Sequence, residues 1–266
     1  MNKKFLELAK KSKVIVIKVG SNILVNEKHV LRKKWLNSLI EDVKEIQKRG
    51  SKIIIVSSGA IALGRNILSK KKLTNLHEKQ AAASIGQIQL LQQWQKALAK
   101  LNIQSSQILI TAEDLNERRK YLNIRNTIYS LMDLDVVPII NENDTTSTEE
   151  IRFGDNDKLS AMIANALSAE LLILLSDVNG LYTANPTKSV QAKLITSVEE
   201  VDQQIEKYID KDLSEFGSGG MLAKINAAKL CIQSGSTMII SNGLVNNPLN
   251  KIDPQSSTWF HPSKNI

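Results

Sequence analysis

Short apolar runs that alternate with longer helical patterns are the feature of this sequence that most constrains its fold. The run 13–19 is almost entirely β-branched, and similar apolar runs lie at 52–56, 136–140, 171–175 and 237–241. Strands this apolar are typical of a sheet covered on both faces, because neither side of such a strand can face water. The alternation predicts an α/β fold, a three-layer α/β/α sandwich with a mostly parallel central sheet, helices on both faces and right-handed crossovers.

Helical spacing fills most of the stretches between these runs. Trp35, Leu36 and Leu39 begin an apolar stripe that continues to Ile46, and Gly50 is a natural terminator for that helix. The sequence predicts helices at 31–49, 76–101, 113–134, about 155–169, 199–209 and 221–233, a further strand at 107–111, an irregular segment at 178–192, and a sheet that is closed by the strand 237–241.

The length of the chain fits one α/β domain with a large core. A chain of 266 residues can bury a substantial core without disulfides, and its single Cys231 lies among apolar residues on a helical pattern. A small buried thiol in a reducing compartment fits that position better than a nucleophile does. No internal repeat or Pro/Gly-rich linker divides the chain. We therefore expect one domain, 1–266, with lobes of about 1–165 and about 166–266 within one continuous sheet.

The net charge of +8 raises the question of a nucleic-acid partner. The basic residues are scattered, their densest run is 70–72, and aromatic residues make up only 4% of the chain, so platforms for base stacking are scarce. The first apolar run is interrupted by Lys18 and is too short to span a membrane. The sequence predicts a cytoplasmic protein without a nucleic-acid or membrane partner, and its positive field suits an enzyme that gathers anionic substrates.

Polar side chains and glycine turns follow the predicted strands where each strand ends. They are Lys18, Ser58-Gly59, Asn141-Glu-Asn-Asp144, Asp155-Asn-Asp157, Ser176-Asp177 and the loop 217–220 with Lys224 behind it. Taken singly, each has an ordinary structural explanation, such as a helix cap, a turn or a solvated lysine. Parallel strands bring their carboxyl ends to one edge of the sheet, where open α/β folds bind ligands. Lysines, glycine turns at helix starts and a few acids at one edge are typical of phosphoryl transfer.

Several other kinds of site do not fit the sequence. The glycine loop 217–220 is followed by Met-Leu-Ala-Lys, which matches neither a Walker loop nor the dinucleotide-binding pattern. His29, His77 and His261 lie far apart without ligand spacing. The sequence therefore indicates neither a histidine metal site nor a catalytic triad, and we assign no protein ligand to a metal.

The order of these motifs closely resembles the amino acid kinase family, and within it the members that phosphorylate glutamate. The resemblance spans residues 13 to about 260. The paired Asn-Glu-Asn-Asp and Gly-Asp-Asn-Asp motifs are typical of the glutamate-phosphorylating members, and the lysine and Ser-Gly-Gly motifs of the wider family. The residues that carry it are Ile17-Lys-Val-Gly-Ser21, Val56-Ser-Ser-Gly-Ala-Ile-Ala-Leu-Gly64, Asn141-Glu-Asn-Asp144, Gly154-Asp-Asn-Asp157, Leu175-Ser-Asp177, Gly180-Leu-Tyr-Thr183 and Ser218-Gly-Gly-Met-Leu-Ala-Lys224.

The resemblance implies transfer of the γ-phosphoryl group of Mg-ATP to the side-chain carboxylate of L-glutamate, the first step of proline synthesis. By matched position, Lys18 and Lys224 would neutralise the moving phosphoryl group, and Asp157 would hold both lysines in place. The N-terminal lobe would bind glutamate and the C-terminal lobe ATP. Glutamate would contact Ser58, Asp144 and Asn156. ATP would contact Lys18, Ser176, Asp177, Ser218, Gly219, Gly220, Met221, Leu222, Ala223 and Lys224.

The resemblance has further implications for partners and domain content. It implies feedback inhibition by proline and a homo-oligomer, either a dimer or a tetramer. The chain ends soon after Trp259-Phe260, where the kinase domain of longer family members ends, so we expect no appended RNA-modification-type domain. Family members usually carry Thr at Ser176 and Ser218, Ser-Thr at Leu222-Ala223, and Asp at Asn185, and these departures bear on the affinity for ATP.

Two alternatives to a glutamate kinase stay open at this point. One is a related kinase whose acceptor is aspartate, acetylglutamate or a nucleoside monophosphate. The other is a nucleotide-binding regulatory or nucleic-acid-associated protein that kept the fold and lost catalysis, which the basic composition and the departures in the ATP loop would fit.

Overall fold

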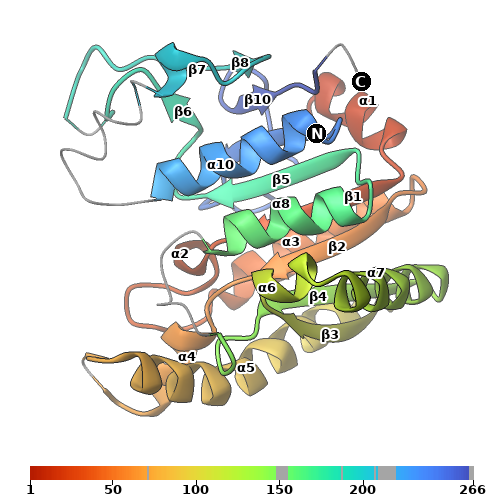
Figure 1. Ribbon diagram of the computed structural model, residues 1–266, viewed down its shortest axis with the longest axis vertical. Coiled ribbons are helices and arrows are strands. Elements are labelled where there is room, and N and C mark those ends of the chain that lie inside the picture. Colours follow the sequence, from red (N-terminus) through yellow and green to blue (C-terminus); the bar gives the residue numbers. More distant parts are fainter. Residues whose placement is uncertain (71, 148–154, 187, 207, 209–219, 264–266) are drawn as a thin grey trace.

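The computed structural model describes residues 1–70, 72–147, 155–186, 188–206, 208 and 220–263. Its centre is a sheet of eight strands in the order β3-β4-β2-β1-β5-β9-β10-β8 (Figure 1). The strands are β1 (Val14–Val19), β2 (Lys52–Ser57), β3 (Gln104–Ile110), β4 (Val136–Glu142), β5 (Leu171–Ser176), β8 (Ser197–Val198), β9 (Thr237–Asn242) and β10 (Thr258–Phe260). The six strands from β3 to β9 in this order run parallel, as the apolar runs predict.

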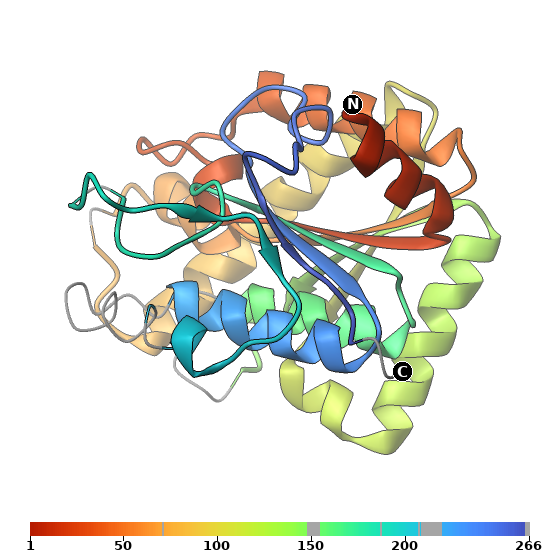
Figure 2. The same ribbon diagram turned by 90° about the horizontal axis from the view of Figure 1, so that it is seen from above.

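Helices cover both faces of the sheet, which confirms the three-layer α/β/α architecture (Figure 2). Along β1, Ile15 and Ile17 pack with α1, α3 and α5 on one face, whereas Val16 packs with α7, α8 and α10 on the other. The helices are α1 (Lys3–Lys11), α2 (Ser21–Leu24), α3 (Lys33–Gln47), α4 (Ala60–Ile67), α5 (Leu76–Ala99), α6 (Ala112–Asn116), α7 (Arg118–Asp133), α8 (Asp155–Ala166) and α10 (Gly220–Gln233).

The parallel strands end at one edge of the sheet, and the connections that leave this edge carry most of the predicted site. The edge lies near α2 and α4 in Figure 1. Strand β1 is central, with β2 and β5 as its neighbours, and its residue Lys18 pairs with Val56 and Leu174. A side chain from the end of β1 can therefore meet groups that follow both neighbouring strands.

Two glycines allow α4 and α5 to cross at close range beside this edge. A Cβ atom on Gly86 of α5 would lie 1.9 Å from the carbonyl oxygen of Ala60, and one on Gly64 of α4 would lie 1.7 Å from that of Ala82. Neither position has space for any side chain, because real Cβ atoms do not approach backbone atoms so closely. The N-terminal half of α5 is thus held against the start of α4, directly after β2.

The prediction that 237–241 closes the sheet was wrong. The short strand β10 pairs antiparallel with β9, and β8 pairs with the far side of β10. Trp259 and Phe260 are buried there. Strands of two or three residues are too short to display a period in the sequence.

Smaller differences concern element boundaries. The helix predicted over 113–134 is two helices, because Glu117 is extended and its carboxylate accepts a hydrogen bond from the backbone N–H of Arg119 at the start of α7. The segment 178–192, predicted to be irregular, contributes β6 (Leu181–Tyr182), which pairs with β7 (Leu194–Ile195). Of the helix predicted at 199–209, residues 203–206 and 208 are helical, whereas 207 and 209 lie outside the described residues. None of the described helices combines the length and apolar character that a membrane span needs.

Candidate active site

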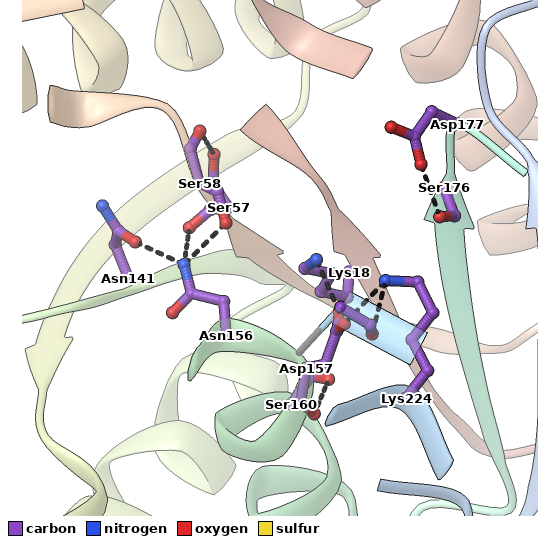
Figure 3. Close-up of polar contacts among 11 residues, drawn as sticks. Lys18, Ser57, Ser58, Asn141, Asn156, Asp157, Ser160, Ser176, Asp177 and Lys224 are labelled. Atoms are coloured by element: carbon purple, nitrogen blue, oxygen red, sulfur yellow. Dashed lines mark hydrogen bonds and ion pairs between the residues drawn. The ribbon is translucent and has the colours of Figure 1, made fainter. Parts of the chain in front are cut away.

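A buried carboxylate joins two lysines from different elements at the edge of the sheet (Figure 3). Asp157 Oδ1 lies 2.5 Å from Lys18 Nζ, and Asp157 Oδ2 lies 2.9 Å from Lys224 Nζ. The Asp157 side chain is fully buried, and the side chains of Lys18 and Lys224 are 9% and 12% exposed. Three charged groups buried together are costly to desolvate, so their mutual arrangement is under strong electrostatic constraint.

The fold explains why these three residues meet. Lys18 lies two residues after Val16 and therefore on the same face of β1, which is the face that α8 and α10 cover. Asp157 lies in the first turn of α8 and Lys224 in the first two turns of α10. A carboxylate in the first turn of a helix is stabilised by the helix dipole. The structural alternative of an N-cap does not describe Asp157, because each carboxylate oxygen contacts a lysine.

Burial and charge act against each other on the pKa values of this group. Burial alone would raise the pKa of Asp157, but the ammonium groups of Lys18 and Lys224 outweigh burial and hold that pKa below its usual value. For Lys18, burial and the neighbouring Lys224 lower the pKa despite the attraction of Asp157. Asp157 is therefore ionised at neutral pH, and Lys18 loses its proton at a lower pH than an exposed lysine does.

The neighbouring residue Asn156 organises a second, uncharged cluster (Figure 3). Asn156 Nδ2 donates to Ser57 O at 2.9 Å, to Ser58 Oγ at 2.7 Å and to Asn141 Oδ1 at 3.0 Å. The two hydrogens of Asn156 Nδ2 are therefore shared among these three acceptors. Asn156 Oδ1 is buried and meets no donor from the described residues. Because 156 and 157 are adjacent on α8, one helix turn joins this cluster to the lysine pair.

Asp144 lines a groove that opens next to the Asn156 cluster. The groove has a volume of about 520 Å³ and is lined by α5, by β3 and by residues 142–145. Gln87 of α5 and Asn143 line the groove together with Asp144. The structure thus brings the predicted glutamate-binding residues to one region: Ser58 and Asn156 share a hydrogen bond, and Asp144 lies three residues beyond their partner Asn141.

The predicted ATP-binding residues lie at the ends of β5 and at the start of α10. Ser176 Oγ donates to Asp177 Oδ1 at 3.2 Å, and Asn22 Nδ2 donates to Asp177 Oδ2 at 3.2 Å. Gly220 begins α10, and a Cβ atom built on it would have no atom of the described residues within 4 Å. The start of a long helix suits an approaching phosphate. Of the other predicted residues, Met221, Leu222 and Ala223 lie in the first turn of α10, whereas Ser218 and Gly219 lie outside the described residues.

Three residues that contact the site were not predicted from the sequence. Asn22 contacts Asp177, Gln87 contacts Asn141, and Ser57 accepts a hydrogen bond from Asn156 and, through its hydroxyl, from Trp94. Asn22 adjoins a motif that the sequence did single out, and Ser57 lies within one. Gln87 sits in a long helix among other glutamines and carries no local signal.

Two other predictions concern metals and the cysteine. Within the described ranges there is no group of three or more His, Cys, Asp or Glu side chains that could hold a metal ion. Cys231 is buried in α10, and burial raises the pKa of its thiol to about 12. A thiol with that pKa is protonated at neutral pH and is a poor nucleophile, which confirms the prediction of a buried apolar role.

Comparison with known proteins identifies the family. The model of the amino acid kinase family matches residues 13–242. Glutamate 5-kinase of Pelagibacter ubique is 49% identical over 255 residues, which is 95% of this chain and 69% of that protein. Glutamate 5-kinase 1 of Mesorhizobium japonicum is 45% identical over 262 residues, 98% of this chain and 69% of that protein.

Solved structures with much lower sequence identity share the fold. Carbamate kinase from Giardia lamblia bound to AMP-PNP has a TM-score of 0.64 at 15% identity, with 96% of this chain and all of that chain covered. Isopentenyl phosphate kinase has a TM-score of 0.64 at 17% identity, with 93% and 99% covered. The matched family model and the high identity to curated relatives agree with the motifs and with the geometry of the site. The chain therefore belongs to the amino acid kinase family, among its glutamate 5-kinases.

Proposed function

We propose that this chain transfers the γ-phosphoryl group of ATP to the side-chain carboxylate of L-glutamate and forms L-glutamyl 5-phosphate. The observation that carries the proposal is the buried arrangement in which Asp157 holds the ammonium groups of Lys18 and Lys224 side by side. The identity to glutamate 5-kinases over nearly the whole chain supports the choice of acceptor. In a cell that makes proline from this product, the reaction would be the first step of proline synthesis.

The lysine pair meets the main electrostatic demand of this reaction. A carboxylate must approach a phosphoryl group that is itself anionic, so cations have to be fixed in place before the group moves. Lysine side chains are flexible, and each would lose much conformational freedom if it were ordered only at the moment of reaction. Asp157 removes this cost, because its two oxygens hold Lys18 and Lys224 at 2.5 and 2.9 Å before any substrate binds.

The Asn156 cluster and Asp144 supply the groups that free glutamate requires. Its α-ammonium group calls for carboxylate and amide acceptors, which Asp144 and Asn156 Oδ1 offer, and its carboxylates call for donors such as the hydroxyl of Ser58. An N-acylated acceptor has no ammonium group and would gain nothing from the charge of Asp144. The composition of the cluster therefore favours glutamate over acetylglutamate.

The residues around β5 and α10 fit a nucleotide. Ser176 and Asp177 offer polar side chains at the end of β5. Lys224 enters the site near the start of α10, where phosphates would bind close to Gly220. Mg²⁺ that travels with ATP would neutralise part of the phosphate charge. The hydroxyls absent at Leu222 and Ala223 would weaken contacts to ATP without removing the lysine. Ser218 and Gly219 complete the proposed loop.

Three expectations from the sequence analysis also belong to the proposal. Proline carries an α-carboxylate and an ammonium group, and it would inhibit by occupying the groups that bind the same parts of glutamate. We further expect the chain to act in the cytoplasm as a homodimer or homotetramer.

Trapping the acyl phosphate with hydroxylamine tests the proposed function. The chain is incubated with Mg-ATP, hydroxylamine and, in separate reactions, glutamate, aspartate, N-acetylglutamate or uridine monophosphate, while hydroxamate and ADP are both measured. We expect glutamate to support hydroxamate formation at least a hundredfold faster than the other acceptors. Equal turnover of N-acetylglutamate would overturn the acceptor assignment, and ADP release only with the nucleotide would point to a nucleoside monophosphate kinase.

A further inference from the structure

We propose that Gln87 of α5 is a positioning residue of the acceptor site, which fixes the orientation of Asn141 and Asn156 so that the hydroxyl of Ser58 presents its hydrogen to a carboxylate of the acceptor. Gln87 belongs to none of the motifs that identify the family. The inference rests on the proposed function, because it assumes that the acceptor carries a carboxylate at Ser58.

A continuous row of hydrogen bonds leads from α5 to Ser58. Gln87 Oε1 accepts from Asn141 Nδ2 at 2.6 Å. Asn141 Oδ1 accepts from Asn156 Nδ2 at 3.0 Å, and Asn156 Nδ2 also donates to Ser58 Oγ at 2.7 Å. Each hydrogen bond in this row therefore has an assigned donor and acceptor.

Backbone groups with only one possible role fix that direction. The N–H of Glu142 donates to Asn141 Oδ1 at 2.9 Å, so the oxygen of the Asn141 amide is identified and its Nδ2 must face Gln87. The carbonyl oxygen of Ser57 accepts from Asn156 Nδ2 at 2.9 Å, which identifies the nitrogen of the Asn156 amide. Two amide nitrogens at 2.6 Å would repel each other, so Gln87 has to present its oxygen to Asn141.

The consequence at the end of the row concerns Ser58. Because Ser58 Oγ accepts from Asn156, its own hydrogen is directed away from Asn156 and can be donated to an anion. If Asn141 turned its amide over, its nitrogen would face the nitrogen of Asn156, and Asn156 would have to move. Asn141 is 2% exposed, so its Nδ2 has no access to water as a substitute for Gln87.

The crossing of α4 and α5 is what brings Gln87 to this position. Gly86 lies against the backbone of Ala60, and the next residue along α5 is Gln87. A side chain at 86 would push α5 away from the start of α4 and would carry Gln87 away from Asn141. Gly86 thus sets the position of α5, and Gln87 connects this helix, which lies outside the motifs, to the acceptor site.

A pair of substitutions separates hydrogen bonding from packing. Gln87→Met keeps the length and shape of the side chain but removes the acceptor, whereas Gln87→Glu keeps an acceptor and removes the donor. Gln93→Met and Gln93→Glu are the matched controls, because Gln93 lies on the same helix but does not line the groove. Initial rates give the KM for glutamate, the KM for ATP and kcat. The melting temperature reports folding, and the change in melting temperature at saturating glutamate reports binding without turnover.

We expect Gln87→Met to raise the KM for glutamate by roughly tenfold, about the effect of one weakened hydrogen bond to a charged ligand, with kcat and the KM for ATP within twofold. Glutamate should stabilise this variant less than it stabilises the wild-type chain. Gln87→Glu should recover most of the affinity, and both Gln93 variants should behave as wild type. A merely structural role would instead lower the melting temperature and change kcat and both KM values together.

The same comparison in an Asn141→Asp background tests the direction of the row. A carboxylate at 141 presents an oxygen to Asn156 in either orientation, so Gln87→Met should add little to the KM in that background. An equal effect of Gln87→Met in both backgrounds, or wild-type kinetics of Gln87→Met, would overturn the inference. Absence of glutamate-dependent hydroxamate in the wild-type chain is a different result, because it would overturn the proposed function itself.

Discussion

Replacing Asp157 with Asn removes one negative charge between two buried lysines and keeps the shape of the side chain. At a charge separation of about 4 Å and an effective dielectric constant of about 20, each attraction amounts to about 4 kcal/mol before the cost of desolvation. In the variant, two ammonium groups share a buried site without an anion. Removing one partner of a buried ion pair lowers the free energy of unfolding by about 3–5 kcal/mol unless the remaining group changes its protonation state.

Lys18 is the group that can change its protonation state, because burial already lowers its pKa. We expect Lys18 to release its proton or turn away in Asp157→Asn, which limits the loss of folding free energy to about 1–2 kcal/mol and the fall in melting temperature to a few degrees. A change in the protonation state of Lys18 does not restore catalysis, because the reaction needs the cation in place. Loss of one preorganised electrostatic group typically lowers kcat by about 10²- to 10³-fold, or about 2.7–4 kcal/mol, and we expect a loss of at least that size.

The assay is kcat for hydroxamate formation at saturating glutamate and ATP, with a melting curve for each protein. Asp135→Asn is the matched control, because Asp135 also pairs with a lysine but its side chain is 87% exposed, and its substitution should leave kcat unchanged. Combining Asp157→Asn with Lys18→Ala should cost much less than the sum of the two single losses, since the residues act as a unit. A folded Asp157→Asn variant with kcat within threefold of wild type would refute the reasoning.

Three further outcomes follow from the structure. Asp42→Ala should lower the free energy of unfolding by about 3 kcal/mol in denaturant titrations, because the buried Asp42 carboxylate accepts from two backbone N–H groups of the loop after β9. Asp135→Asn, which removes an exposed charge and tolerates the left-handed φ of 57° at this position, should change it by less than about 0.5 kcal/mol. The pH profile of kcat/KM for ATP reports the free enzyme, and its alkaline limb should lie below pH 10.5, because the lowered pKa of Lys18 makes the ammonium form disappear earlier as pH rises. A limb at or above that pH would contradict the role of Lys18. Gly86→Ala should unfold the chain or displace α5, with a loss above about 2 kcal/mol and a raised KM for glutamate, while Gly220→Ala, whose Cβ meets no atom of the described residues, should keep wild-type stability. Equal melting temperatures of the Gly86→Ala variant and the wild-type chain would contradict the close crossing of α4 and α5.

The sequence predicted those parts of the fold that depend on local pattern. The apolar runs around β1, β2, β4 and β5 identify buried parallel strands, since few other structures need four runs of this kind. Parallel topology predicted that Lys18 and the segment 155–157 lie at the same edge of the sheet. The contact between Lys18 and Asp157 was implied by the resemblance to the family. The short strand β10 escaped prediction because three residues carry no period.

The contact made by Gln87 shows why the rest could not be predicted. Its partner Asn141 lies 54 residues away, and the two meet only because Gly86 lets α5 lie against the backbone of α4. A glycine inside a helix indicates a close approach, but it does not say which backbone is approached. The orientation of an amide is likewise set by partners from distant segments. The roles of individual site residues therefore stay predictions until the variants are measured.

The most direct test of the account is the identity of the trapped product from glutamate. Mass spectrometry with fragmentation distinguishes the hydroxamate of the side-chain carboxylate from that of the α-carboxylate, and wild type is compared with Asp157→Asn at equal protein concentration. We predict the side-chain hydroxamate from wild type, formed only with ATP, and at least a hundredfold less from the variant. An α-hydroxamate, or the side-chain product at equal rates from both proteins, would contradict a site in which Asp157 holds Lys18 and Lys224 for transfer to the side chain of glutamate.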